Sequence, residues 1–209
     1  IMTSNWNDFN TAEEPQDYSI IPKGELVKVR FDIKPGGYDD PSQNWQGGLA
    51  TFSERTGAVY LQGEFTVLEG KYAKRKIWSN IGLYSPNGPA WGNMGRSFLK
   101  GVLNSAFGVM PQDQSEAAQK KRYVAGIHSL VGMEFVARID VEKDQYNDHK
   151  NVINNAVTPD HKEYAAVRGN INVSVSAHAP VPAQHANVQP VQQIGYSAPS
   201  QQVPNRQNW

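Results

Sequence analysis

The chain has 209 residues, with 20 basic and 20 acidic side chains and no cysteine. A chain of this length can bury a core of its own, and the absence of cysteine excludes disulfide bonds, thiol catalysis and cysteine-ligated metal sites. No apolar run approaches the roughly 18 residues that a membrane span needs, and the first residues lack the basic and apolar regions of a signal peptide. The sequence therefore predicts a cytoplasmic protein that does not enter a membrane.

The zero net charge conceals a segregation of charge along the chain. Residues 1–22 contain four acidic side chains and no Lys or Arg, whereas residues 71–122 contain nine basic side chains and two acidic ones. A polyanion responds to the local potential rather than to the net charge. The composition is therefore compatible with a nucleic-acid partner.

The chain is predicted to divide into three regions. Residues 1–22 form an acidic N-terminal arm, residues 23–168 a folded domain, and residues 169–209 a tail rich in Pro and Gln. The tail has no acidic residue and no periodic pattern, and such a segment buries too little apolar surface to offset the entropy lost on ordering. We expect the tail to be disordered.

Alternation of apolar and polar residues predicts strands within the folded domain. The first strand is followed by a long loop dense in Gly and turn residues, residues 34–48. The second and third strands form a hairpin that presents Tyr60 and Trp78 on one side. The expected strands are residues 24–33, 59–70, 75–83, 133–142 and 151–157.

Helical spacing follows the third strand. Apolar side chains recur on one helix face over residues 93–108, and Gly108 has the position of a C-cap. Residues 113–126 predict a second helix, in which Asp113 and Glu116 have the spacing of a capping box. The expected apolar face of the first helix consists of Met94, Phe98, Val102, Leu103 and Phe107.

The order of the elements is three strands, helical material and two strands. This order predicts a mainly β fold with helical insertions (α+β), namely a five-stranded OB-like Greek-key barrel whose helix lies between strands three and four. An antiparallel sheet packed on helices in another topology would produce the same order of elements.

Aromatic and basic residues are interleaved at the places where an OB fold binds oligonucleotides. These places are the face of strands two and three and the loops that join strands one to two and four to five, here residues 59–83, 34–58 and 143–150. Stacking on a ring contributes about 1–3 kcal/mol per base, while Lys and Arg follow the phosphates. The candidate nucleic-acid-binding residues are Tyr38, Trp45, Tyr60, Lys71, Tyr72, Lys74, Arg75, Lys76, Trp78, Lys143, Tyr146 and Lys150.

A further candidate is Arg96, near the start of the first helix, where backbone amides attract phosphate. The alternative for the basic and aromatic hairpin is structural. In that case Trp78 and Tyr84 pack in the core or under the helix, and the lysines only solvate a turn.

Signals of catalysis or metal binding are weak, so we expect no enzymatic activity, no cofactor and no metal. The histidines have no metal-ligand spacing. Asp160 and Lys162, with Asp140 upstream, have the residue types of a metal-dependent nuclease. However, an acid two residues before a lysine also occurs at three other places, Asp32/Lys34, Glu69/Lys71 and Asp148/Lys150. No nucleophile motif of the Gly-x-Ser-x-Gly type is present.

Three stretches together resemble a phage- and prophage-associated protein family of formally unknown function. They are "YLQGEFTVLEGKYAKRKIWSNIGL", "LVGMEFVARIDVEKD" and "KNVINNAVTP", within a resemblance over residues 18–167. The family occurs in replication and recombination gene neighbourhoods and is regarded as binding single-stranded DNA. Its matching positions in the basic hairpin are Tyr72, Lys74, Arg75 and Trp78.

The resemblance implies single-stranded DNA as the partner, replication or recombination proteins as further partners, and the cytoplasm of a bacterial host as the location. Proteins that bind single strands often end in an acidic tail that recruits partners, but this tail has Arg206 and no acid. Two alternatives stay open: a virion or scaffold-type structural protein that binds another protein, and a metal-dependent nuclease. The sequence also leaves open a homo-oligomer.

Overall fold

The computed structural model describes residues 9–10 and 19–169 of the chain. The described strands are β1 (Leu26–Lys34), β2 (Tyr38–Asp40), β3 (Trp45–Phe52), β4 (Val59–Val67), β5 (Lys76–Tyr84), β6 (Met133–Lys143) and β7 (His149–Ala156). The described helices are α1 (Ala90–Phe107), α2 (Glu116–Lys121) and α3 (Tyr164–Arg168), together with the 3-10 helices η1 (Pro41–Gln43) and η2 (Ile127–Leu130). The protein is therefore mainly β with helical insertions, as the sequence predicts.

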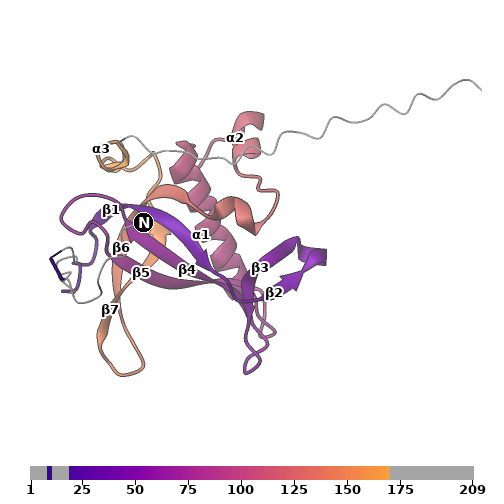
Figure 1. Cartoon of the computed structure of the whole chain (residues 1–209). Coiled ribbons are helices and arrows are strands. Elements are labelled where there is room, and N and C mark those ends of the chain that lie inside the picture. The colour runs from indigo at the N-terminus through magenta and orange to yellow at the C-terminus, as the bar shows by residue number, and fades with distance from the viewer. Residues whose placement is uncertain (1–8, 11–18, 170–209) are drawn as a thin grey trace, which may run out of the picture. The chain divides into compact units, whose positions relative to one another are not determined.

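All seven described strands belong to one antiparallel sheet (Figure 1). Strand β1 pairs with β4 on one side and with β6 on the other, β4 also pairs with β5, and β6 pairs with β7. The sheet curls until its outer strands meet, and the Ile153 amide of β7 donates to Ser79 Oγ of β5 at 2.9 Å. Among the described strands no backbone pairing joins β5 to β7, so the sheet is a half-barrel.

The inner face of the half-barrel is packed with aromatic rings. Phe31 and Phe65 stack with their ring centroids 4.9 Å apart, and Phe65 meets Phe98 of α1 and Phe135 of β6 edge-on at 6.1 and 5.9 Å. Burial of each such ring stabilises the fold by about 1.5–3 kcal/mol. The alternation predicted within residues 24–33 and 59–70 is confirmed for β1 and β4, since their apolar residues other than Leu26 and Tyr60 lie on this face.

Helix α1 lies across the open side of the curled sheet and contacts β5, β6 and β7 (Figure 1). Part of its contact with β5 is a direct approach of the two backbones. A Cβ atom on Gly95 would lie 1.9 Å from the Gly82 carbonyl oxygen, and one on Gly92 would lie 2.7 Å from the Leu83 carbonyl oxygen. Only glycine lets helix and strand backbones approach this closely.

For α1, the sequence predicts the C-cap correctly and the burial of one side chain wrongly. Gly108 is the C-cap, with φ of 65°. Met94 was expected in the core and is 69% exposed. The reason is that Gly92 and Gly95 face β5 in this part of the helix, so Met94 lies beside the contact.

The second predicted helix is shorter than expected. Ser115 is the N-cap of α2, because its Oγ accepts from the Ala118 amide at 3.2 Å, while Asp113 accepts from the Ser115 amide one step earlier. The capping box assigned to Asp113 is therefore wrong. The helix ends near Arg122, whose Nε donates to Asn104 Oδ1 of α1 at 2.7 Å and ties the chain back to α1.

The loop predicted over residues 34–48 contains strand β2, η1 and the first part of β3. Strand β3 pairs with the first residues of β4, so the hairpin β2–β3 extends the sheet beyond the end of β1. This hairpin was missed because β2 is three residues long and the first residue of β3, Trp45, is followed by Gln46 and two glycines. The protein thus has strands in addition to the five that were expected.

Both borders of the folded domain were predicted from composition. Ile21, which was assigned to the N-terminal arm, is fully buried, and its amide and carbonyl group bind the Asn151 side chain at 2.9 and 2.8 Å. Most of the arm, and the tail from residue 170 on, lie outside the described residues.

Lys28, on the polar side of β1, is buried and forms an ion pair with Glu134 at 3.8 Å. A second apolar cluster, in which Tyr164 of α3 packs on Val136, covers this end of the outer face. In the described part of the chain no helix combines the length and the apolar character that a membrane crossing needs.

The contact between α1 and β5 predicts a large effect of a single methyl group. Gly95→Ala is expected to lower the free energy of unfolding by about 1–3 kcal/mol, because the helix must move away from Gly82. The control is Gly101→Ala in the same helix, where the new Cβ would lie 3.4 Å from the Ala156 Cβ, an ordinary contact. The control should be neutral or stabilising by up to about 1 kcal/mol. Urea unfolding measures both, and equal effects would contradict the close approach.

Candidate nucleic-acid interface

The candidate interface is the outer face of the hairpin β4–β5. We call it the β4–β5 face and define it by Tyr60, Gln62 and Glu64 of β4 and Lys76, Trp78 and Asn80 of β5. In the strand register, Glu64 lies opposite Trp78 and Gln62 lies opposite Asn80. Their neighbours Phe65 and Ile77 are buried on the inner face, and alternation along a strand therefore points the six side chains outward.

Glu64 connects the two central side chains of this face. Its Oε1 lies 2.6 Å from Lys76 Nζ, and its Oε2 accepts a hydrogen bond from Trp78 Nε1 at 3.2 Å. The Trp78 side chain is held by its N–H edge and is still 58% exposed. Its flat faces are therefore accessible, whereas the charge of Lys76 is compensated.

The same contacts shift the ionisation of Glu64. The hydrogen bond from Lys76 is the largest influence and holds the pKa of the Glu64 carboxyl below its usual value, and the Trp78 hydrogen bond acts in the same direction. Partial burial of the carboxyl opposes them. Glu64 is therefore an anion at neutral pH and accepts the hydrogen bond from Trp78 in this form.

A pair of aromatic rings lies on the same face as Trp78. The rings of Tyr60 and Trp91 have centroids 6.0 Å apart. Trp91, from the first turn of α1, covers Gly82, since a Cβ atom there would lie 2.5 Å from its ring. Gly82 and Trp78 are four residues apart on β5, which corresponds to about 13 Å along a strand. The face thus carries two aromatic positions with Gln62 and Asn80 between them.

The basic residues before β5 have mixed roles. Lys71 and Tyr72 form a contact in the turn, with Nζ 5.3 Å from the ring centroid, and Tyr72 also packs on the core. Arg75 donates to the Ser19 carbonyl oxygen at 2.9 Å and so holds the segment that leads to β1. Lys74 lies in the same turn with φ of 69°. Part of this basic cluster therefore has a structural role.

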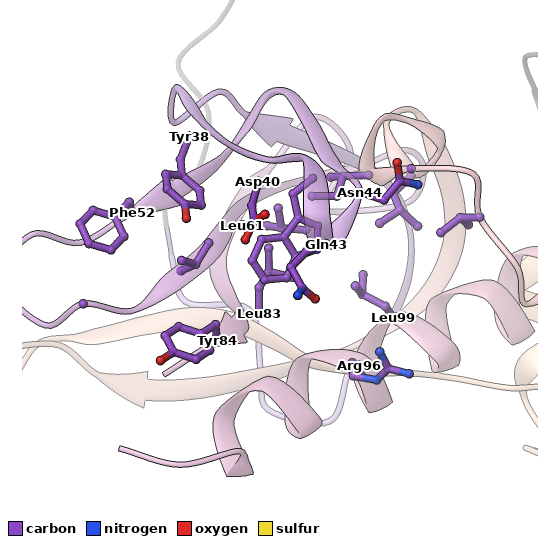
Figure 2. A pocket seen from close by; sticks show the side chains of 17 residues that line it. Tyr38, Asp40, Gln43, Asn44, Phe52, Leu61, Leu83, Tyr84, Arg96 and Leu99 are labelled. Carbon is purple, nitrogen blue, oxygen red and sulfur yellow. The ribbon is translucent and has the colours of Figure 1, made fainter. Parts of the chain in front are cut away.

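Three of the predicted residues lie elsewhere, in a pocket of about 600 Å³ (Figure 2). Tyr38 and Trp45 enter it from the hairpin β2–β3, and Arg96 enters it from α1. The pocket is also lined by Val59 and Leu61, whose side chains belong to the inner face of β4. It is therefore separate from the β4–β5 face.

The remaining three predicted residues lie around the turn between β6 and β7. Lys143 Nζ donates to Asn147 Oδ1 at 2.9 Å, Lys150 lies opposite Glu142, and Tyr146 is 76% exposed. Figure 1 shows this turn and the hairpin β2–β3 extending from different parts of the sheet.

The structure therefore distributes the predicted residues over separate places. It brings Tyr60, Lys76 and Trp78 together on one face, next to the turn with Lys71, Tyr72, Lys74 and Arg75. It brings Tyr38, Trp45 and Arg96 together in the pocket, and it leaves Lys143, Tyr146 and Lys150 at the β6–β7 turn.

Two residues of the interface were missed in the sequence. Glu64 was assigned only to a polar strand face, and its role could have been found from the hairpin register that places it opposite Trp78. Trp91 gives no signal in the sequence, because its position over Gly82 depends on where α1 crosses β5.

The two aspartates considered for a nuclease are engaged in other contacts. Asp140 Oδ1 lies 2.8 Å from Lys23 Nζ, and Asp160 accepts a hydrogen bond from the Thr158 hydroxyl. Within residues 9–10 and 19–169, no three acidic or histidine side chains are grouped so that they could hold a metal ion.

No protein-family model matches this chain, and no curated protein matches it. What the β4–β5 face can do therefore follows from its own geometry.

The Lys76–Glu64 contact predicts a pH-dependent contribution to stability. Because the pKa of Glu64 is lowered by folding, this contribution is fully present above the usual value of 4.5 and is lost as the pH falls through the lower, folded value. Glu64→Gln removes it. Wild type is expected to exceed the variant in free energy of unfolding by less than about 1 kcal/mol at neutral pH, with the difference shrinking below pH 4.5. Urea unfolding at stepped pH measures it, and a difference independent of pH would contradict the assignment.

Proposed function

We propose that this protein binds single-stranded DNA on the β4–β5 face, as a non-enzymatic phage-type protein of DNA replication or recombination. The observation that carries the proposal is the exposed Trp78, which is fixed by its N–H edge to Glu64 and presents its ring faces beside Lys76. An exposed indole that is held in place can stack on a base of any sequence.

The order of strand pairing supports an OB-like barrel as the scaffold. If hairpin β2–β3 is taken as part of a loop, the strands β1, β4, β5, β6 and β7 are paired in the order β5-β4-β1-β6-β7. Helix α1 lies between the third and fourth of these strands, and the edges β5 and β7 approach each other at Ser79 and Ile153. In an OB fold the second and third strands bind oligonucleotides, and these correspond to β4 and β5.

The aromatic spacing on this face supports binding of more than one base. Tyr60 with Trp91 and, about 13 Å away, Trp78 offer two stacking positions. The intervening Gln62 and Asn80 are polar side chains that can bind base edges or sugar. Sequence-tolerant binding is expected, because every base has a face that can stack.

The charges of the face suggest how phosphate would bind. Lys76 is paired with Glu64, and the adjacent β1 carries Arg30 paired with Asp32 at 2.8 Å. A phosphate that binds Lys76 competes with Glu64 for this cation, and the exposed Lys76–Glu64 pair contributes only about 0–1 kcal/mol. Lys71, in the turn next to the face, adds a further cation.

The ring of Trp78 is expected to contribute directly to affinity. Trp78→Ala should weaken binding to oligo-dT by about 1–3 kcal/mol, the value of one stacked base. The control is Tyr123→Ala, which removes a 77% exposed ring in the connection between α2 and η2; it should leave the affinity unchanged. Titration by fluorescence anisotropy of labelled oligo-dT measures both. An equal affinity for Trp78→Ala and wild type would remove the basis of the proposal.

The lysines are expected to set the salt dependence. Each neutralised phosphate of a single strand contributes about −0.7 to the slope of log affinity against log salt, so Lys71→Gln with Lys76→Gln should flatten the slope by about 1.4. The matched control is Lys120→Gln with Lys121→Gln on α2, where Lys120 has an ion pair with Glu116 of the same 2.6 Å length. Oligo-dT affinity is measured at several salt concentrations. An unchanged slope in the first variant would place the phosphates elsewhere, and failure to bind at low salt would favour a protein-binding, structural role.

A further inference from the structure

The pocket under hairpin β2–β3 has an apolar floor and is separate from the β4–β5 face. Its floor consists of inward side chains of β4 and β5 and of η2, among them Leu61, Leu83 and Leu130. Its volume of about 600 Å³ lies within the range of about 300–1,000 Å³ that is usual for sites of small organic ligands. A pocket of this size and composition can take one flat organic group.

The roof of the pocket is held in place by contacts within the protein. The Asn44 side-chain amide donates to the Ala125 carbonyl oxygen, which ties η1 to the segment before η2. The Gly36 and Gly37 amides donate to the Gly48 carbonyl oxygen at 3.0 and 2.8 Å. A Cβ atom on Gly36 would lie 1.9 Å from Thr51 Oγ1, so the two segments are in close contact. The pocket is therefore formed before any ligand arrives.

Aromatic rings surround the mouth of the pocket, and two of them are exposed to water. Tyr38 and Phe52 stack with centroids 5.5 Å apart and an angle of 24° between the rings. Phe52 is 43% exposed, and Tyr84, at the end of β5, is 52% exposed. Figure 2 shows Tyr38 and Phe52 on one wall and Tyr84 on the other. A planar ring that enters the mouth would cover these rings and gain stacking energy.

Polar groups without partners stand at two sides of the pocket. Among the described residues, the guanidinium of Arg96 and the side-chain amide of Gln43 form no hydrogen bond and no ion pair. Asp40 uses its Oδ1 for both the amide and the hydroxyl of Ser42, which leaves Oδ2 available. Arg96 lies on α1, across the pocket from Asp40 on β2 (Figure 2). The pocket thus offers a cation on one wall and groups that can bind a base edge on the other.

We propose that this pocket binds one nucleotide, with the base between the rings of Tyr38 and Tyr84, the base edge at Asp40 and Gln43, and the phosphate on Arg96. Guanidinium groups bind phosphate through two parallel hydrogen bonds, which suits an unpaired Arg. The nucleotide is either free or part of a bound single strand. Binding of a nucleotide within a single strand rests on the proposed function, whereas binding of a free nucleotide does not.

The test uses the full chain with deoxyadenosine monophosphate and deoxyadenosine as ligands. Binding is followed by NMR through the indole N–H signals of ¹⁵N-labelled protein. The signal of Trp45 is assigned as the one that is missing in Trp45→Phe. The nucleotide is expected to shift the Trp45 signal and to leave that of Trp78 in place. Arg96→Ala should weaken binding of the nucleotide by about tenfold or more, which corresponds to the loss of a charged hydrogen bond. Binding of the nucleoside, which has no phosphate, should be unchanged. Tyr84→Leu should weaken the binding of both ligands, because it removes a ring on which the base stacks.

The matched control is Lys100→Ala, which removes an exposed cation of the same helix that does not line the pocket. Oligo-dA affinity is then compared among Arg96→Ala, Lys100→Ala and Trp78→Ala. A loss of oligo-dA affinity in Arg96→Ala but not in Lys100→Ala identifies a nucleotide of the strand as the occupant. Nucleotide binding without that loss identifies a free nucleotide.

The proposal is overturned if millimolar nucleotide leaves the Trp45 signal in place, or if Arg96→Ala and Lys100→Ala weaken nucleotide binding equally. Either result leaves the proposal for the β4–β5 face standing, because Trp78→Ala tests that proposal independently. Conversely, Trp78→Ala could bind oligo-dA normally while nucleotide still shifts the Trp45 signal. That result would contradict the proposed function and support nucleotide binding in the pocket.

Discussion

The alternation of side chains along β4 is the constraint on which both candidate sites depend. This strand pairs with β1 and β3 along one edge and with β5 along the other. Its inward residues, such as Leu61 and Phe65, build the core and the floor of the pocket, and its outward residues, such as Glu64, build the β4–β5 face. A shift of one residue in register would exchange the two sets. The packing of Phe65 against Phe31, Phe98 and Phe135 prevents such a shift.

The two candidate sites differ in how their charges are arranged. On the β4–β5 face, Glu64 compensates Lys76 and orients Trp78, so a polyanion would replace one ion pair by another and gain its affinity from stacking. In the pocket, Arg96 has no partner among the described residues and lines the same cavity as the exposed rings of Phe52 and Tyr84. Surface stacking that tolerates any sequence suits the first site, whereas recognition of a single flat anionic group suits the second. If both proposals hold, the protein contacts nucleotides on both faces of β4.

Much of the fold could be predicted from local pattern. The alternation in β1 and β4, the shared face of Tyr60 and Trp78 and the C-cap at Gly108 follow from the sequence, because each depends on neighbours along the chain or on backbone conformation. Two of the errors have a common cause. Met94 is exposed because Gly92 and Gly95 make the contact with β5, and α2 ends early because Arg122 is tied to Asn104 of α1. Both effects come from contacts between residues far apart in sequence.

The candidate site shows the same division. The sequence by itself determined which residues could bind nucleic acid, since rings and cations cluster before and within β5, and it determined that Tyr60 and Trp78 share a face, since alternation has a fixed period. Only the tertiary structure decided that Glu64 meets Lys76 and Trp78, that Arg75 holds Ser19, and that Tyr38, Trp45 and Arg96 line one pocket. The physical reason is that local pattern fixes the direction of a side chain, whereas its partners depend on how the sheet curls and where α1 crosses it.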